Sequence, residues 1–302
     1  MKAIVLHEYG GPHKLKYEDV ADPKPGPGEV LVRTTAASVN PIDYKMRSGA
    51  AKDHFPVEFP AILGRDVAGL VRALGEDVTG FEVGERVMAL TWHTYAELVV
   101  VKASDLAKVP EGLDLAEAGA LPLAILTGDQ LIHKAAKVKA GETVLITGAV
   151  GSVGRVAVYA ALQLGAKVIA GVRRKQLEEA RALGLTEALA IDDADAMKRL
   201  GIVDAVADMV GGPLATELLG KVKQGGTFGS LLGVPKDATL HPTVQVNAIT
   251  AEPNAKTIEE YATAVRDKKL TIPIDRMLPL AEAAEAHIVV EKGGIAKVVL
   301  LA

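Results

Sequence analysis

The stretch Val144-Leu-Ile-Thr-Gly-Ala-Val-Gly-Ser-Val-Gly-Arg-Val-Ala-Val158 decides the fold of the second half of the chain. An apolar strand over 144–147 runs into closely spaced glycines, and a helix rich in Ala and Val follows over 152–164. The glycines form a G-x-G-x-x-G pattern in which Ala149 replaces the first glycine. Such a pattern gives a tight turn, a position where backbone can approach a pyrophosphate, and free N–H groups at the helix start. Because the required strand and helix flank it, we predict a nucleotide site at Ala149, Val150, Gly151, Ser152, Val153 and Gly154.

The rest of the second half alternates apolar strands with amphipathic helices, which is typical of a doubly wound parallel sheet. The predicted strands cover 144–147, 167–172, 187–191, 203–209 and 226–232, and the helices between them cover 152–164, 174–183 and 213–219. We therefore predict an α/β protein with a Rossmann domain.

The first third has a different pattern, with short strands separated by turns. Strands are predicted over 2–6, 29–34, 67–73, 86–90 and 96–101, and five of the seven residues over 22–28 are Pro or Gly. This spacing favours a barrel-like β unit. Helices are predicted over 115–121, 127–136, 257–267 and 280–290. The pattern leaves open whether the last strand, 296–301, joins the second sheet or returns to the first unit.

The end of the strand after the glycine helix bears on the choice of cofactor. NAD-binding folds place an acid about 20 residues after the glycines, where it holds the ribose 2′-hydroxyl. Here Gly171 is followed by Arg173, Arg174 and Lys175, with no acid among them. Guanidinium groups bind a 2′-phosphate bidentately, so we predict NADPH rather than NADH. A solvated helix start is the alternative, although the helix dipole disfavours three cations there.

Composition excludes several other classes. The chain has 302 residues, no Cys and a formal net charge of -4, so there is no disulfide, no thiol nucleophile and no general positive field for nucleic acid. No apolar run approaches the roughly 20 residues of a membrane span, and the first residues lack the pattern of a signal peptide. We expect a cytoplasmic protein that binds neither nucleic acid nor membrane.

The seven His residues show no ligand spacing such as H-x-x-x-H. Each is more simply a surface or packing residue, and His93 beside Trp92 is the one that a short loop can bring to a cleft. Trp92, the single Trp, either walls that pocket or packs elsewhere. We expect no metal site.

Several segments together resemble the zinc-free quinone oxidoreductase branch, the zeta-crystallin-like enzymes, of the medium-chain dehydrogenase/reductase superfamily. The resemblance covers essentially the whole chain and is far more specific than any one motif. The segments are Met1–Val5, Gly26–Val32, Gly64–Gly69, Val83–Val87, Tyr95–Glu97, Pro122–Thr127, the glycine motif and Asp208–Gly212.

The resemblance implies a GroES-like β-barrel-type catalytic domain over 1–120 and 255–302 and a Rossmann NADPH-binding domain over 121–254, with the active site in the cleft between them. It also implies a homodimer that pairs edge strands near 244–248. Zinc relatives carry Cys and Gly-His-Glu ligands where this chain has Val39-Asn40 and Gly64-Arg65-Asp66, so the resemblance implies a metal-free enzyme.

By the same resemblance, the catalytic candidates are Asn40, Asp43, Tyr44 and Arg65. We expect Asn40 or Tyr44 to bind a substrate carbonyl, and Asp43 to orient the site or pair with Arg65. A turn or a helix cap is the alternative role for Asn40 and Asp43.

The remaining cofactor candidates lie elsewhere in the chain. Thr127 corresponds to the family's hydroxyl near the nicotinamide, with helix capping as its alternative role. Leu232, Gly233 and Val234 follow a strand at its carboxyl end, where ligands collect in open α/β sheets.

The expected activity is metal-free hydride transfer from NADPH to a quinone or another activated enone. Two alternatives stay open: a reductase of 2-alkenals or enones without quinone activity, and a non-catalytic NADPH-binding sensor.

Overall fold

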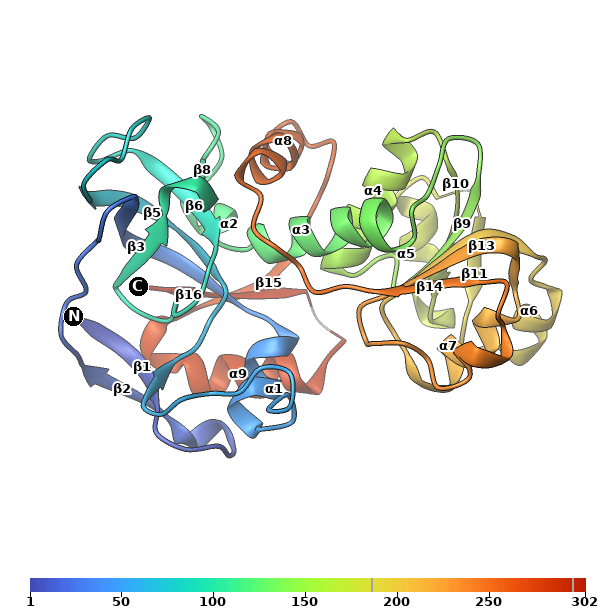
Figure 1. Cartoon of the computed structure of the whole chain (residues 1–302), viewed down its shortest axis with the longest axis horizontal. Helices are drawn as coiled ribbons and strands as arrows, with labels where there is room; N and C mark the ends of the chain where they lie inside the picture. Colours follow the sequence, from blue (N-terminus) through green and yellow to red (C-terminus); the bar gives the residue numbers. More distant parts are fainter. Residues whose placement is uncertain (186, 295) are drawn as a thin grey trace. The chain divides into compact units, whose positions relative to one another are not determined.

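The computed structural model describes residues 1–185, 187–294 and 296–302, and the chain forms two compact units (Figure 1). One unit is a continuous segment, Ala124–Ala251. The other combines Met1–Leu123 with Glu252–Ala302. The chain therefore passes from one unit to the other within helix α3 (Pro122–Gln130) and returns after residue 251.

The continuous unit is built on a six-stranded parallel sheet with the strand order β11-β10-β9-β12-β13-β14. In order of appearance along the chain this is 3-2-1-4-5-6, the order of dinucleotide-binding folds, so the predicted Rossmann domain is confirmed. The strands are β9 (Thr143–Thr147), β10 (Lys167–Val172), β11 (Glu187–Ala190), β12 (Val203–Asp208), β13 (Val222–Ser230) and β14 (Gln245–Ala248). The helices are α4 (Ser152–Gln163), α5 (Leu177–Ala182), α6 (Ala194–Arg199) and α7 (Gly212–Leu219).

Apolar strands give this sheet its core. Leu145, Val206 and Phe228 lie on neighbouring strands, are fully buried, and pack with Leu218 and Leu219 of α7. Strands covered on both faces read as continuous apolar runs, and the predicted ranges match β9, β10, β11 and β12 within a residue. Strand β13 begins four residues before the predicted 226, and β14 was expected only through the resemblance.

Some helices differ from the prediction. The helix expected over 127–136 begins at Pro122, because proline suits the first position of a helix, and it ends in a π-helix, η3 (Leu131–Ala135). The helix expected over 174–183 starts as a 3-10 turn, η4 (Arg174–Gln176). The unpredicted helix α6 is short and polar, and Asp193 caps it by accepting from the N–H groups of residues 195 and 196.

The other unit holds two sheets. The larger has the order β15-β16-β3-β5-β6-β8, with β7 also paired to β3, and the smaller has the order β2-β1-β4. The strands are β1 (Lys2–Leu6), β2 (Leu15–Asp19), β3 (Glu29–Val39), β4 (Ala61–Ile62), β5 (Asp66–Leu74), β6 (Arg86–Leu90), β7 (Leu98–Lys102), β8 (Leu106–Lys108), β15 (Ile274–Pro279) and β16 (Lys297–Leu301). Strand β3 runs five residues beyond the predicted end at residue 34, and these residues reach the candidate site.

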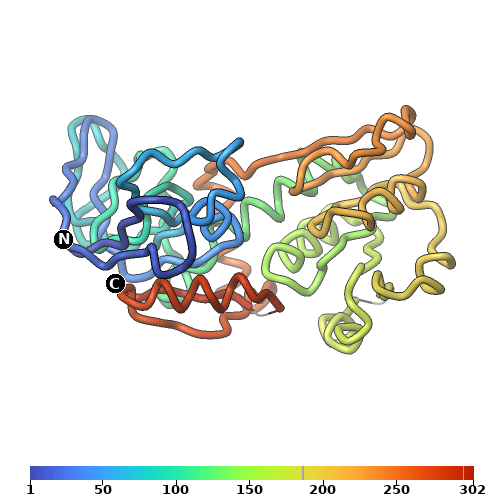
Figure 2. The backbone as a smooth tube through the Cα atoms, turned by 90° about the horizontal axis from the view of Figure 1, so that it is seen from below, coloured from blue at the N-terminus to red at the C-terminus, as the bar shows by residue number. Residues whose placement is uncertain are grey.

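The two ends of the chain meet in this unit. Strand β16 is antiparallel to β3, with Val299 opposite Ser38, and lies between β3 and β15. Helix α9 (Ala283–Lys292) packs on helix α1 (Pro41–Ser48), and Figure 2 shows this C-terminal helix alongside the N-terminal segments. Helices α2 (Leu115–Ala118) and α8 (Ala255–Arg266) complete the unit.

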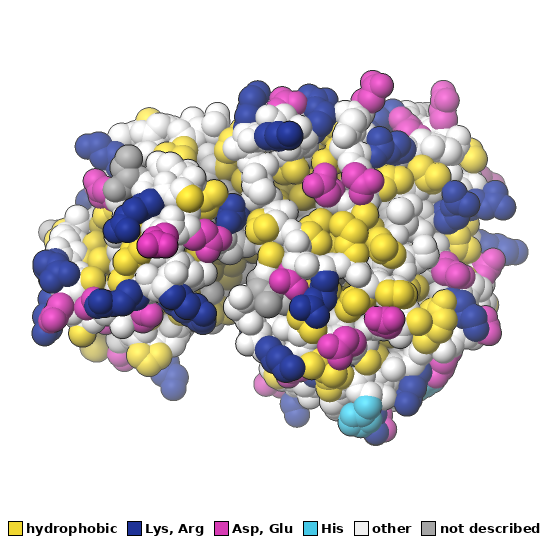
Figure 3. Space-filling view, turned by 180° about the vertical axis from the view of Figure 1, so that it is seen from behind, with side chains coloured by type: hydrophobic (Ala, Val, Ile, Leu, Met, Phe, Trp, Pro, Cys, Tyr) yellow, Lys and Arg dark blue, Asp and Glu magenta, His cyan; other side chains and the backbone are white. Residues whose placement is uncertain are grey.

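Within the described part of the chain, no helix has the length and apolar character needed to cross a membrane. Figure 3 shows acidic and basic side chains interspersed over the face that it presents, without a large field of one sign.

Candidate functional site

The glycine motif forms a tight turn between β9 and α4. Gly148 has a φ of +67°, the left-handed region that favours glycine, and its N–H donates to the carbonyl of Gly171 on β10 at 2.8 Å. A Cβ at Gly154 would lie 2.0 Å from the Gly148 oxygen, so this glycine allows the helix to pack against the turn. Gly151, the residue before α4, is exposed, and the nearest atom to an added Cβ is 3.3 Å away. The turn therefore fits a pyrophosphate, which the first N–H groups of α4 would hold.

The other residues of the predicted phosphate loop differ in exposure. Ala149 and Val150 are buried, with 0% and 4% of their surface exposed, whereas Ser152 and Val153 are half-buried in the first turn of α4. Gly154 is buried as well, so Gly151, Ser152 and Val153 are the positions of the predicted set that leave atoms accessible to a ligand. The phosphate-binding role of the set stays a prediction.

A buried carboxylate supports the loop beside this turn. Asp208, at the end of β12, accepts from the Thr147 hydroxyl at 2.8 Å and from the N–H groups of Val210 and Gly211 at 3.1 and 3.0 Å. Thr147 Oγ1 accepts in turn from the N–H of Met209 at 2.8 Å. The ends of β9 and β12 are neighbours in the sheet where the strand order reverses, which is where such folds bind ligands. No pattern in the sequence predicted this network.

The basic cluster at the end of β10 is exposed, but its members are not equivalent. The Arg174 guanidinium is paired with Asp193, and the Arg174 N–H donates to Asp192 at 2.7 Å. The N–H groups at the start of α6, above all that of Ala196, lower the pKa of Asp193 and keep it anionic. Arg173 and Lys175 make no side-chain ion pair among the described residues. They are the cations of the cluster that a phosphate can recruit.

The remaining cofactor candidates lie on α3 and after β13. Thr127 is half-buried in the second turn of α3. Leu232 and Val234 are 50% and 61% exposed in the loop after β13, and Gly233 between them has a φ of +87°. Exposed apolar side chains at a strand's carboxyl end suit contact with a planar ring.

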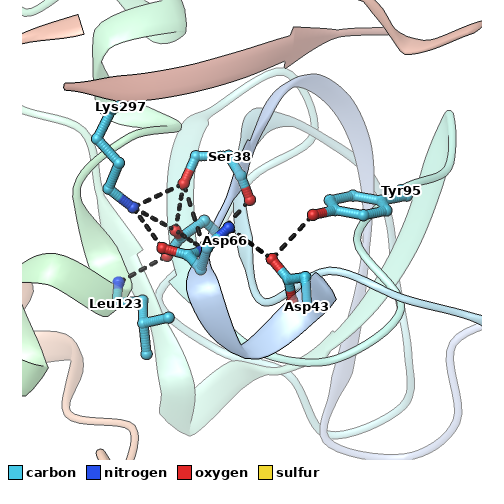
Figure 4. Close-up of polar contacts among 7 residues, drawn as sticks. Ser38, Asp43, Asp66, Tyr95, Leu123 and Lys297 are labelled. Carbon is cyan, nitrogen blue, oxygen red and sulfur yellow. Dashed lines mark hydrogen bonds and ion pairs between the residues drawn. The ribbon is translucent and has the colours of Figure 1, made fainter. Parts of the chain in front are cut away.

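Asp43 is the most perturbed acid of the catalytic candidates. It lies in the first turn of α1, is fully buried, and accepts from the Asn40 N–H and from the Tyr95 hydroxyl, both at 2.8 Å (Figure 4). Burial raises the Asp43 pKa to about 6, and these two donors only partly oppose the shift. The second oxygen, Oδ1, has no hydrogen-bond partner among the residues that the structure describes. Burial likewise raises the pKa of Tyr95 well above 10.0.

Asn40 lies in a buried ionic cluster that sequence reasoning missed. Its amide donates to Asp66 Oδ2 at 2.9 Å and to the Ser38 carbonyl at 3.2 Å, while its Oδ1 accepts from the Lys297 ammonium at 2.6 Å. Both amide protons are thus used within the protein, and the residue is 4% exposed. The amide therefore has no free donor for a substrate carbonyl, and of the two predicted carbonyl ligands Tyr44 is the one left available. Tyr44 is half-buried and makes no hydrogen bond among the described residues.

Lys297 and Asp66 form the charged pair of this cluster. The Lys297 ammonium donates to Ser38 Oγ at 2.9 Å and lies 3.2 Å from Asp66 Oδ2, and the Ser38 hydroxyl donates to the same oxygen at 2.5 Å (Figure 4). Asp66 Oδ1 accepts from the N–H of Leu123 at 2.6 Å. The contributing residues come from β3, β5, β16, α3 and the N-cap of α1, so no local pattern in the sequence reveals the cluster.

Arg65 does not form the predicted ion pair with Asp43 in the part of the chain that the structure describes. Its Nε donates to the Thr91 carbonyl at 2.9 Å, and its guanidinium lies 3.6 Å from the centre of the Trp92 ring. Because stacking and the carbonyl hold the side chain, Arg65 influences Asp43 only through space. Burial lowers the Arg65 pKa, and the nearby carboxylates of Asp43 and Asp66 oppose that shift.

Trp92 lines a cavity of about 620 Å³ in the same unit. Its ring is 39% exposed and lies 6.2 Å from that of Phe55. His93, whose Nδ1–H donates to the Ile62 carbonyl at 2.8 Å, forms another part of the wall. Met46 and Leu63 add apolar surface. Trp92 and His93, whose roles the sequence left open, thus border the same pocket.

Among the described residues, no group of three or more His, Asp and Glu side chains is arranged to hold a metal ion. The one deeply buried histidine, His287, contacts Arg47 at 3.5 Å and the edge of Tyr95. Its Nε2 has no hydrogen-bond partner in the described part of the chain. Burial lowers the His287 pKa to about 3, so the ring is neutral.

Comparison with known proteins agrees with this architecture. Residues 26–111 match the family model described as an alcohol dehydrogenase GroES-like domain, and residues 183–300 match one described as zinc-binding dehydrogenase. A quinone oxidoreductase from Pseudomonas aeruginosa is 32% identical over 311 residues, covering 95% of this chain and 94% of the relative. The chain belongs to the quinone oxidoreductase branch of the medium-chain dehydrogenase/reductase superfamily. A 2-haloacrylate reductase from a Burkholderia species is also 32% identical, over 94% of both chains.

Solved structures of this superfamily extend the comparison. The quinone oxidoreductase from Coxiella burnetii superposes with a TM-score of 0.89 at 30% identity, over 100% of this chain and 99% of the other. A mycobacterial protein solved with NADPH superposes with a TM-score of 0.86 at 30% identity, over 100% of both chains. The chain is thus an NAD(P)H-dependent oxidoreductase of this superfamily that acts on a small molecule.

Proposed function

We propose that this oxidoreductase uses NADPH to reduce a quinone or another activated enone, without a metal. The proposal rests on two features of the same unit: the open glycine turn at Gly151, and the end of β10, where the chain has cations at residues 173–175 and no acid. When bound, NADPH supplies the hydride, and the protein supplies binding, orientation and electrostatics.

The preference for NADPH rests on two side chains. Because Asp193 holds the Arg174 guanidinium, Arg173 and Lys175 remain to bind a 2′-phosphate. Charge-assisted hydrogen bonds are about twice as strong as neutral ones, whereas an acid in place of Arg173 or Lys175 would repel the phosphate. The mycobacterial relative that was solved with NADPH supports the same choice.

The acceptor site is assigned to the cavity beside Trp92. A cavity of about 620 Å³ with apolar and aromatic walls suits a planar ring or a conjugated carbonyl compound. Tyr44, two residues before the lining residue Met46, is the candidate donor to the acceptor carbonyl. Asp43, held by Tyr95 and the backbone, positions the start of α1 and with it Tyr44, the next residue along the chain.

Metal independence is supported by the residues at the ligand positions of zinc relatives. The chain has no Cys, and Arg65 stands where those relatives have a His ligand. A guanidinium that is stacked on Trp92 brings a positive charge to that position instead of a lone pair.

The test compares oxidation of NADPH and NADH with 1,4-benzoquinone and with an enone as acceptors. We expect turnover that favours NADPH. The Arg173→Ala/Lys175→Ala variant is expected to raise KM for NADPH at least about tenfold, since each charge-assisted hydrogen bond contributes about 1.5–3 kcal/mol, and to leave KM for NADH unchanged. Arg174→Ala is the matched control and should change KM for NADPH less than about threefold.

Equal use of both cofactors by the unmodified protein would overturn the NADPH assignment. Dialysis against a chelator should leave turnover intact, and loss of activity that zinc restores would overturn the metal-free mechanism.

A second candidate is an enone or 2-alkenal reductase without quinone activity. The 2-haloacrylate reductase relative favours it, because a haloacrylate is an activated C=C acceptor rather than a quinone. Turnover with the enone and none with 1,4-benzoquinone would select it.

Two further expectations complete the proposal. Strand β14 is an edge strand of the parallel sheet, so its free side is available for pairing with a second copy in a homodimer. The cytoplasmic location rests on the cysteine-free composition.

A further inference from the structure

Lys297 is a buried charge to which the proposed mechanism assigns no role. It begins strand β16, is 7% exposed, and uses all three ammonium protons on Ser38, Asn40 and Asp66. A buried ion pair adds little net stability over apolar side chains of the same volume. We therefore ask what this pair holds in place.

The pair holds the start of helix α3. Asp66 Oδ2 takes the three donors of the cluster, which leaves Oδ1 to accept the N–H of Leu123 at 2.6 Å. Leu123 follows Pro122, which has no N–H, so it carries the first N–H group of the helix. A carboxylate at this position is further stabilised by the helix dipole.

Helix α3 also carries Thr127. Residues 123 and 127 are four apart and so lie on the same face of the helix, one turn from each other. The Thr127 side chain is half-buried and makes no hydrogen bond among the described residues. Further along, a Cβ at Gly128 would lie 2.6 Å from Val156 of α4, so the helix has little room to shift on that side.

We propose that Lys297 is a positioning residue for the nicotinamide end of the cofactor site. By neutralising and orienting Asp66, it fixes the start of α3 and thereby the Thr127 hydroxyl. The inference rests on the proposed function, because it assigns Thr127 to the nicotinamide.

Removal of the ammonium acts on two partners at once. Asp66 loses its only counter-charge in the cluster, and Asn40 Oδ1 loses its donor, so the Asn40 amide is no longer held in one orientation. A buried carboxylate without a counter-charge recruits water or a proton. Either event alters Asp66 Oδ1 as the acceptor of the Leu123 N–H.

The experiment measures dissociation constants for two probes, NADPH and 2′,5′-ADP. The second probe has the adenosine 2′-phosphate end and lacks the nicotinamide. For Lys297→Met we expect about fivefold weaker binding of NADPH, the loss that corresponds to one hydrogen bond, with 2′,5′-ADP within twofold of the unmodified protein. Thr127→Val should show the same selective loss, and the double variant no further loss, because the two residues act through one interaction.

Two variants serve as controls. Lys292→Met removes an exposed lysine near the same end of the chain and should leave both constants unchanged. Lys297→Arg keeps the charge and should retain NADPH binding within threefold. If Lys297→Met does not fold, as judged by thermal unfolding, Lys297→Gln is measured by the same criteria.

Three results would overturn the inference: NADPH binding within twofold of the unmodified protein, equal weakening of both probes, or additive losses in the double variant. Failure of the proposed function looks different, because the unmodified protein would then bind neither probe or bind NADPH without oxidising it in the presence of any acceptor.

Discussion

The buried carboxyl of Asp43 makes stability depend on pH in a way that can be worked out from the structure. Its pKa is raised from 3.8 to about 6, chiefly by burial, so the folded protein binds this proton more tightly than the unfolded chain. The stabilisation is fully present below the unfolded pKa and is lost as the pH rises through about 6. Over the whole range the raised pKa corresponds to about 3 kcal/mol.

The assay compares the unmodified protein with Asp43→Asn, which has a similar shape and does not titrate. Denaturant unfolding at intervals from pH 4 to pH 8 gives the free energy of unfolding of each. As the pH rises from 4 to 8, we expect the free energy of unfolding of the variant to increase by about 2 kcal/mol relative to that of the unmodified protein. Most of this change should fall between pH 4.5 and 6.5. Asp53→Asn, at an exposed carboxylate, is the matched control for loss of a charge. A difference between Asp43→Asn and the unmodified protein that stays constant across this range would refute the reasoning.

Three further predictions concern other positions. Gly154→Ala is expected to prevent α4 from packing, since its Cβ would meet the Gly148 oxygen at 2.0 Å, whereas Gly151→Ala should fold and bind NADPH more weakly. Thermal unfolding and NADPH titration measure the two effects, and a stable Gly154→Ala or an unfolded Gly151→Ala would contradict the assignment. Asp208→Ala leaves three donors without their acceptor and should lower the free energy of unfolding by about 3 kcal/mol or more. Guanidinium unfolding measures this loss, and a value below about 1 kcal/mol would contradict the network. Because burial lowers the His287 pKa from 6.5 to about 3, the protein loses stability as the pH falls below 6.5. When the pH is lowered from 8 to 5, the free energy of unfolding of His287→Leu should therefore rise by about 2 kcal/mol relative to that of the unmodified protein. Parallel pH profiles of the two proteins would argue against a buried neutral ring.

The fold was predictable where the deciding interactions are local. The glycine turn, the apolar strand before it and the helix after it occupy one short stretch, and all of the predicted ranges there lie within a residue or two of β9, α4 and β10. The six-residue helix α6 was missed because its stability comes from the Asp193 cap and tertiary packing rather than from a long apolar period.

The candidate site was less predictable because its partners are distant in sequence. Lys297 lies 259 residues from Ser38 and 231 from Asp66, so no spacing rule connects them. Asn40 could be identified from its motif, but the partners that occupy its amide lie too far away in the sequence to be predicted. Likewise, three adjacent cations gave no sign that Asp193 holds the middle one, since that acid lies at the end of another strand.

The position of β16 in the middle of the larger sheet has a consequence for biosynthesis. A ribosome releases the continuous segment 124–251 as one uninterrupted length, so that unit can fold while later residues are still being made. The other unit cannot finish in the same way, because β3 gains its β16 neighbour only after residues 297–301 have left the exit tunnel. Until then the nascent chain displays part of an unpaired strand edge and an empty place for the Lys297 ammonium. Slow translation of, or truncation before, residues 297–301 should therefore expose this edge to aggregation or chaperone capture, even though the nucleotide-binding unit is already complete.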